Sequence, residues 1–169
     1  PEGLNPADRC LVGSRGSGGP PMLNNIYNNT YRIVQTPGHV MILVEMMHDA
    51  RIIPIGGAHR PAAVRQWLGD SVGRWEGETL VVVTRGWNRQ HGDYEPVYLS
   101  DEAVVTERFT RVAEGELLYA FEIDDPGFYT QTWRGEMTFT PSPGDLYEYA
   151  CHEGNYALAN ILSGARRQD

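Results

Sequence analysis

Between residues 129 and 140, apolar and polar side chains alternate without a break. One set of alternate positions carries Tyr129, Gln131, Trp133, Gly135, Met137 and Phe139, and the other carries Thr130, Thr132, Arg134, Glu136, Thr138 and Thr140. A period of two is typical of a β-strand, whose successive side chains point to opposite faces of a sheet. The chain is therefore predicted to form a sheet with one largely aromatic face on a core and one polar face in water.

Seven further segments show strand patterns that are separated by turn signals. In the run 39–47, alternate positions place Val40, Ile42, Val44, Met46 and His48 on one face, which is the better candidate for the core. The run 79–84 has four successive apolar residues, as in a strand that is covered on both faces. The other predicted strands are 31–36, 51–55, 103–112, 117–123 and 146–151.

Helical turns are expected only at 61–68, between Pro61 and Gly69, and at 156–162. About eight sequential antiparallel strands predict an all-β fold, either a lipocalin-like up-and-down barrel or a strongly curved sheet. The 169 residues fit one domain. We expect an irregular N-terminal arm at 1–30 that wraps this domain, a barrel-like body at 31–165 and a charged tail at 166–169.

The chain has two cysteines, Cys10 and Cys151, and neither belongs to a CxxC pair. We expect a disulfide between them, which closes a loop of about 140 residues and contributes roughly 4–5 kcal/mol in the chain-entropy model. The alternative is two unrelated buried thiols. Because a disulfide needs an oxidising compartment, the pair predicts an extracytoplasmic protein, either periplasmic or secreted.

Composition excludes several classes of function. All 14 basic residues are Arg, and with 22 acidic residues the formal net charge is −8, so we expect no nucleic-acid partner. No apolar run approaches the ~20 residues of a transmembrane helix, so no transmembrane segment is expected. The five His form no HxH, HxxxH or HExxH pattern, and we predict neither a metal site nor a cofactor.

Several longer motifs carry a resemblance to a known group of proteins. They are MHDARIIP at 47–54, RQWLGDS at 65–71, RWEGETLVV at 74–82 and EYACHEGNY at 148–156. Through them the chain resembles an uncharacterised family of exported bacterial proteins. The resemblance implies an exported, barrel-like domain that is a mature or C-terminal portion of a longer precursor, and it carries over no catalytic residue.

Candidate functional residues fall into three groups. The candidate catalytic groups are His48, His152 and Glu153, because each His is followed by a carboxylate that could orient an imidazole, although each His also has a purely structural interpretation. The aromatic face offers a hydrophobic ligand site, or a filled interior, at Tyr129, Trp133, Met137 and Phe139. The polar loop 85–101 offers protein contacts at Arg89, His91, Asp93 and Tyr94.

Two hypotheses of different classes follow. The first is an exported noncatalytic interaction or structural module, such as an extrinsic periplasmic subunit of a larger membrane-associated complex with other protein subunits as partners. The second is a barrel that binds a small hydrophobic molecule, or an enzyme of the hydrolase, lyase or isomerase type with its His and Glu groups at the barrel mouth. The absence of a recognisable catalytic motif favours the first.

Overall fold

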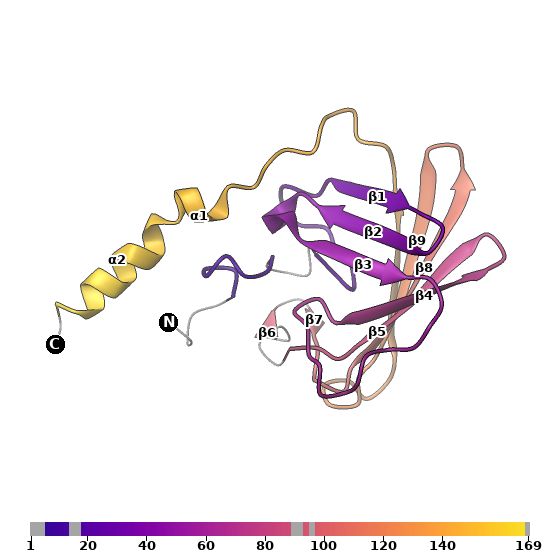
Figure 1. Cartoon of the computed structure of the whole chain (residues 1–169), viewed down its shortest axis with the longest axis horizontal. Coiled ribbons are helices and arrows are strands. Elements are labelled where there is room, and N and C mark those ends of the chain that lie inside the picture. Colours follow the sequence, from indigo (N-terminus) through magenta and orange to yellow (C-terminus); the bar gives the residue numbers. More distant parts are fainter. Residues whose placement is uncertain (1–5, 14–17, 89–92, 95–96, 168–169) are drawn as a thin grey trace.

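The structure, a computed structural model, describes residues 6–13, 18–88, 93–94 and 97–167. Two antiparallel sheets make up the body (Figure 1). The first has the order β1-β2-β3, with β1 (Tyr31–Gln35), β2 (His39–Val44) and β3 (Ala50–Pro54). The second has the order β10-β9-β8-β5-β4, with β4 (Asp70–Glu76), β5 (Thr79–Arg85), β8 (Val104–Ala113), β9 (Glu116–Asp124) and β10 (Trp133–Phe139). A short ribbon pairs β6 (Asp93–Tyr94) with β7 (Val97–Tyr98).

The predicted all-β, mainly antiparallel class is confirmed, whereas a closed barrel is not shown. The two sheets meet on one side through a bridge between Ile55 and Gly73, where the Gly56 N–H donates to the Gly73 carbonyl at 2.8 Å. A Cβ on Gly73 would lie 3.0–3.1 Å from side-chain atoms of Ile55 and Ile53, so this close approach favours glycine. On the other side, β1 and β10 are outer strands that are not paired with each other in the described structure.

The core lies between the inner faces of the two sheets. Val40, Ile42, Val44 and Met46 are 1–2 % exposed, as their alternation predicts, but His48 is exposed. In β5, Val81 and Val82 are both fully buried, so this strand is covered on both faces as expected. Strands β8 and β9 contribute Val105, Phe109, Tyr119, Phe121 and Ile123 to the core cluster. Met22, Ile53, Leu80, Trp87, Leu99 and Ala103 complete it.

Three local predictions need correction. The helix expected at 61–68 does not form, and the segment is a series of turns. The strand expected from residue 39 to 47 ends at Val44, because a 3₁₀ turn at Met46–His48 with a positive φ at Met47 reverses the chain into β3. The strand expected at 129–140 begins only at Trp133, and residues 146–150 are irregular.

The N-terminal arm enters the body instead of only wrapping it. Residues 18–22 are all buried, and Met22 belongs to the core cluster. The Met22 N–H donates to the Tyr119 hydroxyl of β9 at 2.8 Å, while a Cβ on Gly19 would lie 3.2 Å from Arg51 of β3. This part of the arm therefore fills space between the two sheets.

The C-terminal segment leaves the sheets and ends in two helices, α1 (Cys151–Gly154) and α2 (Tyr156–Ala165). The helices extend away from the β-body, on the side where the N-terminal chain also lies (Figure 1). The predicted disulfide is present between Cys10 and Cys151, with a Cα–Cα distance of 5.9 Å. It ties α1 to the arm. No helix among the described residues is long and apolar enough to cross a membrane.

Candidate functional site

A buried ion pair lies at the centre of the sandwich. Arg51 of β3 and Glu107 of β8 have side chains that are 2 % and 0 % exposed. The Arg51 Nη1 donates to Glu107 Oε1 at 3.0 Å, and Nη2 donates to Oε2. The Tyr119 hydroxyl donates to Glu107 Oε1 at 2.9 Å, so the carboxylate is shared by a cation and a phenol. The pair thus links the two sheets across the core.

Burial and charge act together on this cluster. Burial tends to lower the pKa of the Arg51 guanidinium, but the Glu107 carboxylate more than offsets this, so that its pKa lies above the ordinary value. Burial, followed by the negative charge of Glu107, raises the pKa of Tyr119 well above its ordinary value. The cluster therefore holds one cation, one anion and one neutral phenol, a combination that suits a structural clamp.

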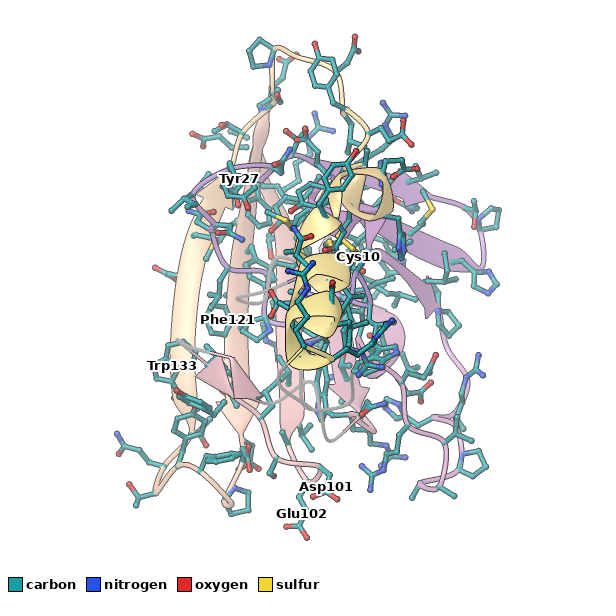
Figure 2. All side chains as sticks on the ribbon, turned by 90° about the vertical axis from the view of Figure 1, so that its left-hand side faces the viewer. Cys10, Tyr27, Asp101, Glu102, Phe121 and Trp133 are labelled. Atoms are coloured by element: carbon teal, nitrogen blue, oxygen red, sulfur yellow. A yellow bond between two sulfur atoms is a disulfide. The ribbon has the colours of Figure 1, made fainter. Side chains whose placement is uncertain are left out.

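The aromatic candidates lie around this filled interior. Tyr129, Met137 and Phe139 are partly buried and pack against the core cluster, and the Phe139 ring lies 5.4 Å from that of Tyr119. Trp133 lies beside Phe121 at the margin of the five-stranded sheet (Figure 2), with its ring 5.3 Å from Phe121 and its residue 38 % exposed. These contacts suit an interior that is occupied by the chain itself.

A hollow of about 700 Å³ opens where β1 and β10 fail to pair. Its walls include Tyr31 and Ile33 of β1, Leu117 of β9 and Phe139 of β10. The Tyr31 and Phe139 rings lie 5.4 Å apart in this wall. Burial raises the pKa of Tyr31 to about 12, so its hydroxyl is neutral near pH 7. The hollow offers aromatic and aliphatic surface to a small ligand.

The three catalytic candidates have different surroundings. His48 Nε2 accepts a hydrogen bond from the Tyr149 N–H at 3.1 Å, which attaches the C-terminal segment to the body. His152 and Glu153 lie exposed on α1. Within the described part of the chain, no hydrogen bond or ion pair joins His48 to either of them. The residues that the sequence singled out are therefore not assembled into a hydrogen-bonded catalytic group.

Asp49, the neighbour of His48, instead holds the N-terminal arm. Its Oδ2 accepts a hydrogen bond from the Gly13 N–H at 2.7 Å. Burial raises the pKa of Asp49 to about 6, although the Gly13 hydrogen bond acts in the opposite direction. The carboxyl group therefore titrates close to neutrality while it anchors the arm.

The sequence analysis missed a histidine–carboxylate pair that the structure forms. His59 Nδ1 lies 2.9 Å from Asp70 Oδ2, and the same oxygen accepts from the Arg60 N–H at 2.9 Å. Gln66 Nε2 donates to the other oxygen at 3.4 Å. These contacts fold the segment before β4 around one carboxylate. The eleven-residue separation of His59 and Asp70 matches no motif, and Asp70 begins β4, a strand that the sequence analysis did not predict.

Five large apolar or aromatic side chains of the arm, of the segment before α1 and of α2 are exposed. They are Ile26, Tyr27, Tyr147, Tyr156 and Ile161, and we call them the C-terminal surface. All five residues are exposed, from 50 % for Ile161 to 82 % for Ile26. Burial, followed by the neighbouring Tyr27, raises the pKa of Tyr149. The Asn155 side chain contacts the arm at the Asp8 carbonyl. Figure 2 labels Tyr27 and Cys10 in the view of the side on which the C-terminal helices lie.

A hollow of about 610 Å³ adjoins the C-terminal surface. It is lined by Ala7 and Asn28 of the arm, by the segment 148–151, and by Ala157, Leu158 and Ile161 of α2. The Asn155 side chain closes its base by donating to the Asp8 carbonyl at 2.8 Å and capping the Leu158 N–H at 3.2 Å. Because both ends of the chain form these walls, the disulfide fixes their separation.

The loop candidates Arg89, His91, Asp93 and Tyr94 remain a prediction. Arg89 and His91 lie outside the described residues, and Asp93 and Tyr94 are described only as the backbone of β6. Within the described ranges, no group of three His, Cys, Asp or Glu side chains is placed to hold a metal ion. Comparisons with protein-family models, with curated proteins and with solved structures find no match for this chain.

Proposed function

We propose that the chain is an exported, noncatalytic interaction module, an extrinsic periplasmic subunit of a larger membrane-associated complex. The observation that carries this proposal is the apolar side of α2, which includes Ile161 of the C-terminal surface. None of the residues of α2 is buried, although the helix carries Leu158, Ile161 and Leu162 on one face. An apolar helix face that the chain does not cover is typical of a surface that another protein covers.

The filled interior supports the same proposal. The arm residues 18–22 and the Arg51–Glu107 pair occupy the space between the sheets, where small-molecule-binding barrels keep a chamber. The disulfide supports the proposed location, because such bonds persist in oxidising compartments. It also ties α1 to the arm, and the hydrogen bond from the Gly13 N–H to Asp49 joins the arm to the body. Such links favour docking, because fewer degrees of freedom are lost on binding.

A small hydrophobic ligand in the hollow between β1 and β10 is the second candidate function. It is favoured by the aromatic wall that Tyr31 and Phe139 form there. A protein that only binds a small ligand needs no large partner. The two candidate functions therefore predict different masses for the native particle.

The test is the native mass of the tagged protein after gentle detergent extraction from its source cells. We expect an assembly well above two copies of the 18.9 kDa chain. Ile161→Asp on the apolar helix face should release the protein from it. Ser163→Asp, which adds the same charge on the opposite and exposed face of α2, should not. Wild-type protein that migrates as one or two copies, or equal behaviour of the two variants, would contradict the proposal.

A further inference from the structure

Strand β10 is a regular outer strand with an open side. It pairs with β9 in unbroken register from Trp133 opposite Ile123 to Phe139 opposite Leu117, and among the described strands nothing pairs with its other side. An open edge presents unpaired N–H and C=O groups to any other strand. Natural edges are often protected by Pro, a bulge or charged side chains. β10 has no Pro and no bulge, and its two charged residues, Arg134 and Glu136, are of opposite sign.

We propose that β10 pairs antiparallel with β10 of a second copy of this chain, centred on Gly135, so that two five-stranded sheets join into one sheet of ten strands across a two-fold axis. In such an isologous pair, each residue meets the residue equally far from the centre on the other copy. The sequence of β10 can therefore be checked for complementarity with itself.

The polar face of β10 is complementary in this register. Arg134 lies opposite Glu136 of the second copy, and Glu136 lies opposite Arg134 of the second copy. Both residues are exposed, and within the chain Arg134 bonds Glu122 at 2.6 Å while no bond joins Glu136 to any described residue. Opposite charges at directly facing positions stabilise a pair of strands.

Neighbouring registers are disfavoured by the same charges. A centre on Arg134 would place two guanidinium groups opposite each other, and a centre on Glu136 would place two carboxylates opposite each other. Like charges at facing positions destabilise the pairing. A pairing centred between two residues would put inner side chains opposite outer ones. Among the centres on Arg134, Gly135 and Glu136, the charges therefore favour Gly135.

The inner face is also complementary. With the centre on Gly135, Trp133 lies opposite Met137 of the second copy, and the two Gly135 residues face each other. Trp133 is 38 % exposed in the single chain, although its ring already packs on Phe121. A methionine beside the open part of this ring would cover apolar surface that the single chain leaves in water. Both faces of the strand thus point to a second copy as its partner.

This inference does not depend on the proposed function, because β10 and the C-terminal surface involve different residues. The experiment uses the purified full chain, and the readout is the mass by sedimentation equilibrium over a range of concentrations. Wild-type protein should show a monomer–dimer equilibrium. Arg134→Glu and Glu136→Arg each create two like-charge pairs, so each alone should weaken the dimer by at least about tenfold.

A mixture of the two variants provides the decisive measurement. One chain then carries two acidic residues and the other carries two Arg, so a mixed dimer regains both opposite-charge pairs and should form where neither variant dimerises alone. The doubly exchanged chain, Arg134→Glu with Glu136→Arg, should likewise dimerise by itself. Arg74→Glu, at an exposed position of β4 on the opposite edge of this sheet, is the matched control and should behave as wild type.

Thermal unfolding of each variant establishes that loss of the dimer is not loss of folding. The proposal is overturned if wild-type protein stays monomeric up to millimolar concentration, as expected if β10 serves an extended segment of another protein. It is equally overturned if the single charge reversals dimerise as wild type does, or if the mixture is no better than its components.

Discussion

Replacing Arg51 by Met tests whether the ion pair at the centre of the sandwich clamps the two sheets. The substitution keeps a long side chain and removes the guanidinium. Glu107 then retains the Tyr119 hydroxyl as a donor at 2.9 Å and loses both Arg51 contacts. Since the Glu107 side chain is fully buried, water cannot replace the missing donors.

The expected cost is large for a single substitution. Breaking a buried ion pair by removing one partner costs about 3–5 kcal/mol, because the remaining charge stays buried without compensation. With a urea m-value of about 2 kcal/mol/M, the unfolding midpoint should fall by about 2 M. Adding Glu107→Gln removes the charge and keeps an acceptor for Tyr119, so the double variant should be at least about 1 kcal/mol more stable than Arg51→Met alone.

The assay is urea unfolding at pH 7 with the disulfide intact, followed by tryptophan fluorescence and circular dichroism. Arg74→Met is the matched control, because Arg74 pairs with Glu76 at 2.6 Å on the exposed end of β4 and its loss should leave the midpoint nearly unchanged. The clamp is refuted if Arg51→Met costs less than about 1 kcal/mol, or if the double variant is no more stable than the single one.

Two further predictions concern the arm and the junction of the sheets. The folded-state pKa of Asp49, about 6, lies above its ordinary value of 3.8, so this group makes folding more favourable as the pH falls from about 7 to about 4. The free energy of unfolding of wild-type protein, measured by urea titration, should therefore rise relative to that of Asp49→Asn as the pH falls over that range. A difference that does not change with pH would contradict this prediction. Gly73→Ala should cost about 1–3 kcal/mol in thermal unfolding, whereas Gly38→Ala, with open space around its Cβ position, should change little.

Strand positions could be predicted where alternation and turn signals agree. The hairpin of β8 and β9 and the buried face of β2 follow directly from period-two patterns. The prediction of a helix at 61–68 was wrong. Its Pro and Gly boundary signals are local, whereas the segment is held by contacts outside it, with the Arg65 side chain donating to the Asp101 carbonyl at 2.7 Å.

The sequence contains a signal for the buried ion pair, but the pair was not predicted. Arg51 shares a strand face with Ile53, and Glu107 shares one with Val105 and Phe109, so both charges stand on faces that are otherwise apolar. Two such charges of opposite sign can be buried only if they meet. Pairing them required knowing that β3 and β8 face each other, which periodicity alone does not give.

The arm has consequences for where this protein can recognise anything. Its Gly- and Pro-rich sequence shows no period, so its place between the sheets could not be predicted, yet residues 18–22 occupy the space that a ligand would need. Displacing them would break the hydrogen bond from Met22 to Tyr119 and uncover the Arg51–Glu107 pair. Because those contacts stabilise the fold, recognition is better served by surfaces that the fold leaves uncovered. The apolar side of α2 and the open edge of β10 are two such surfaces, and their separation allows one copy to use both at once.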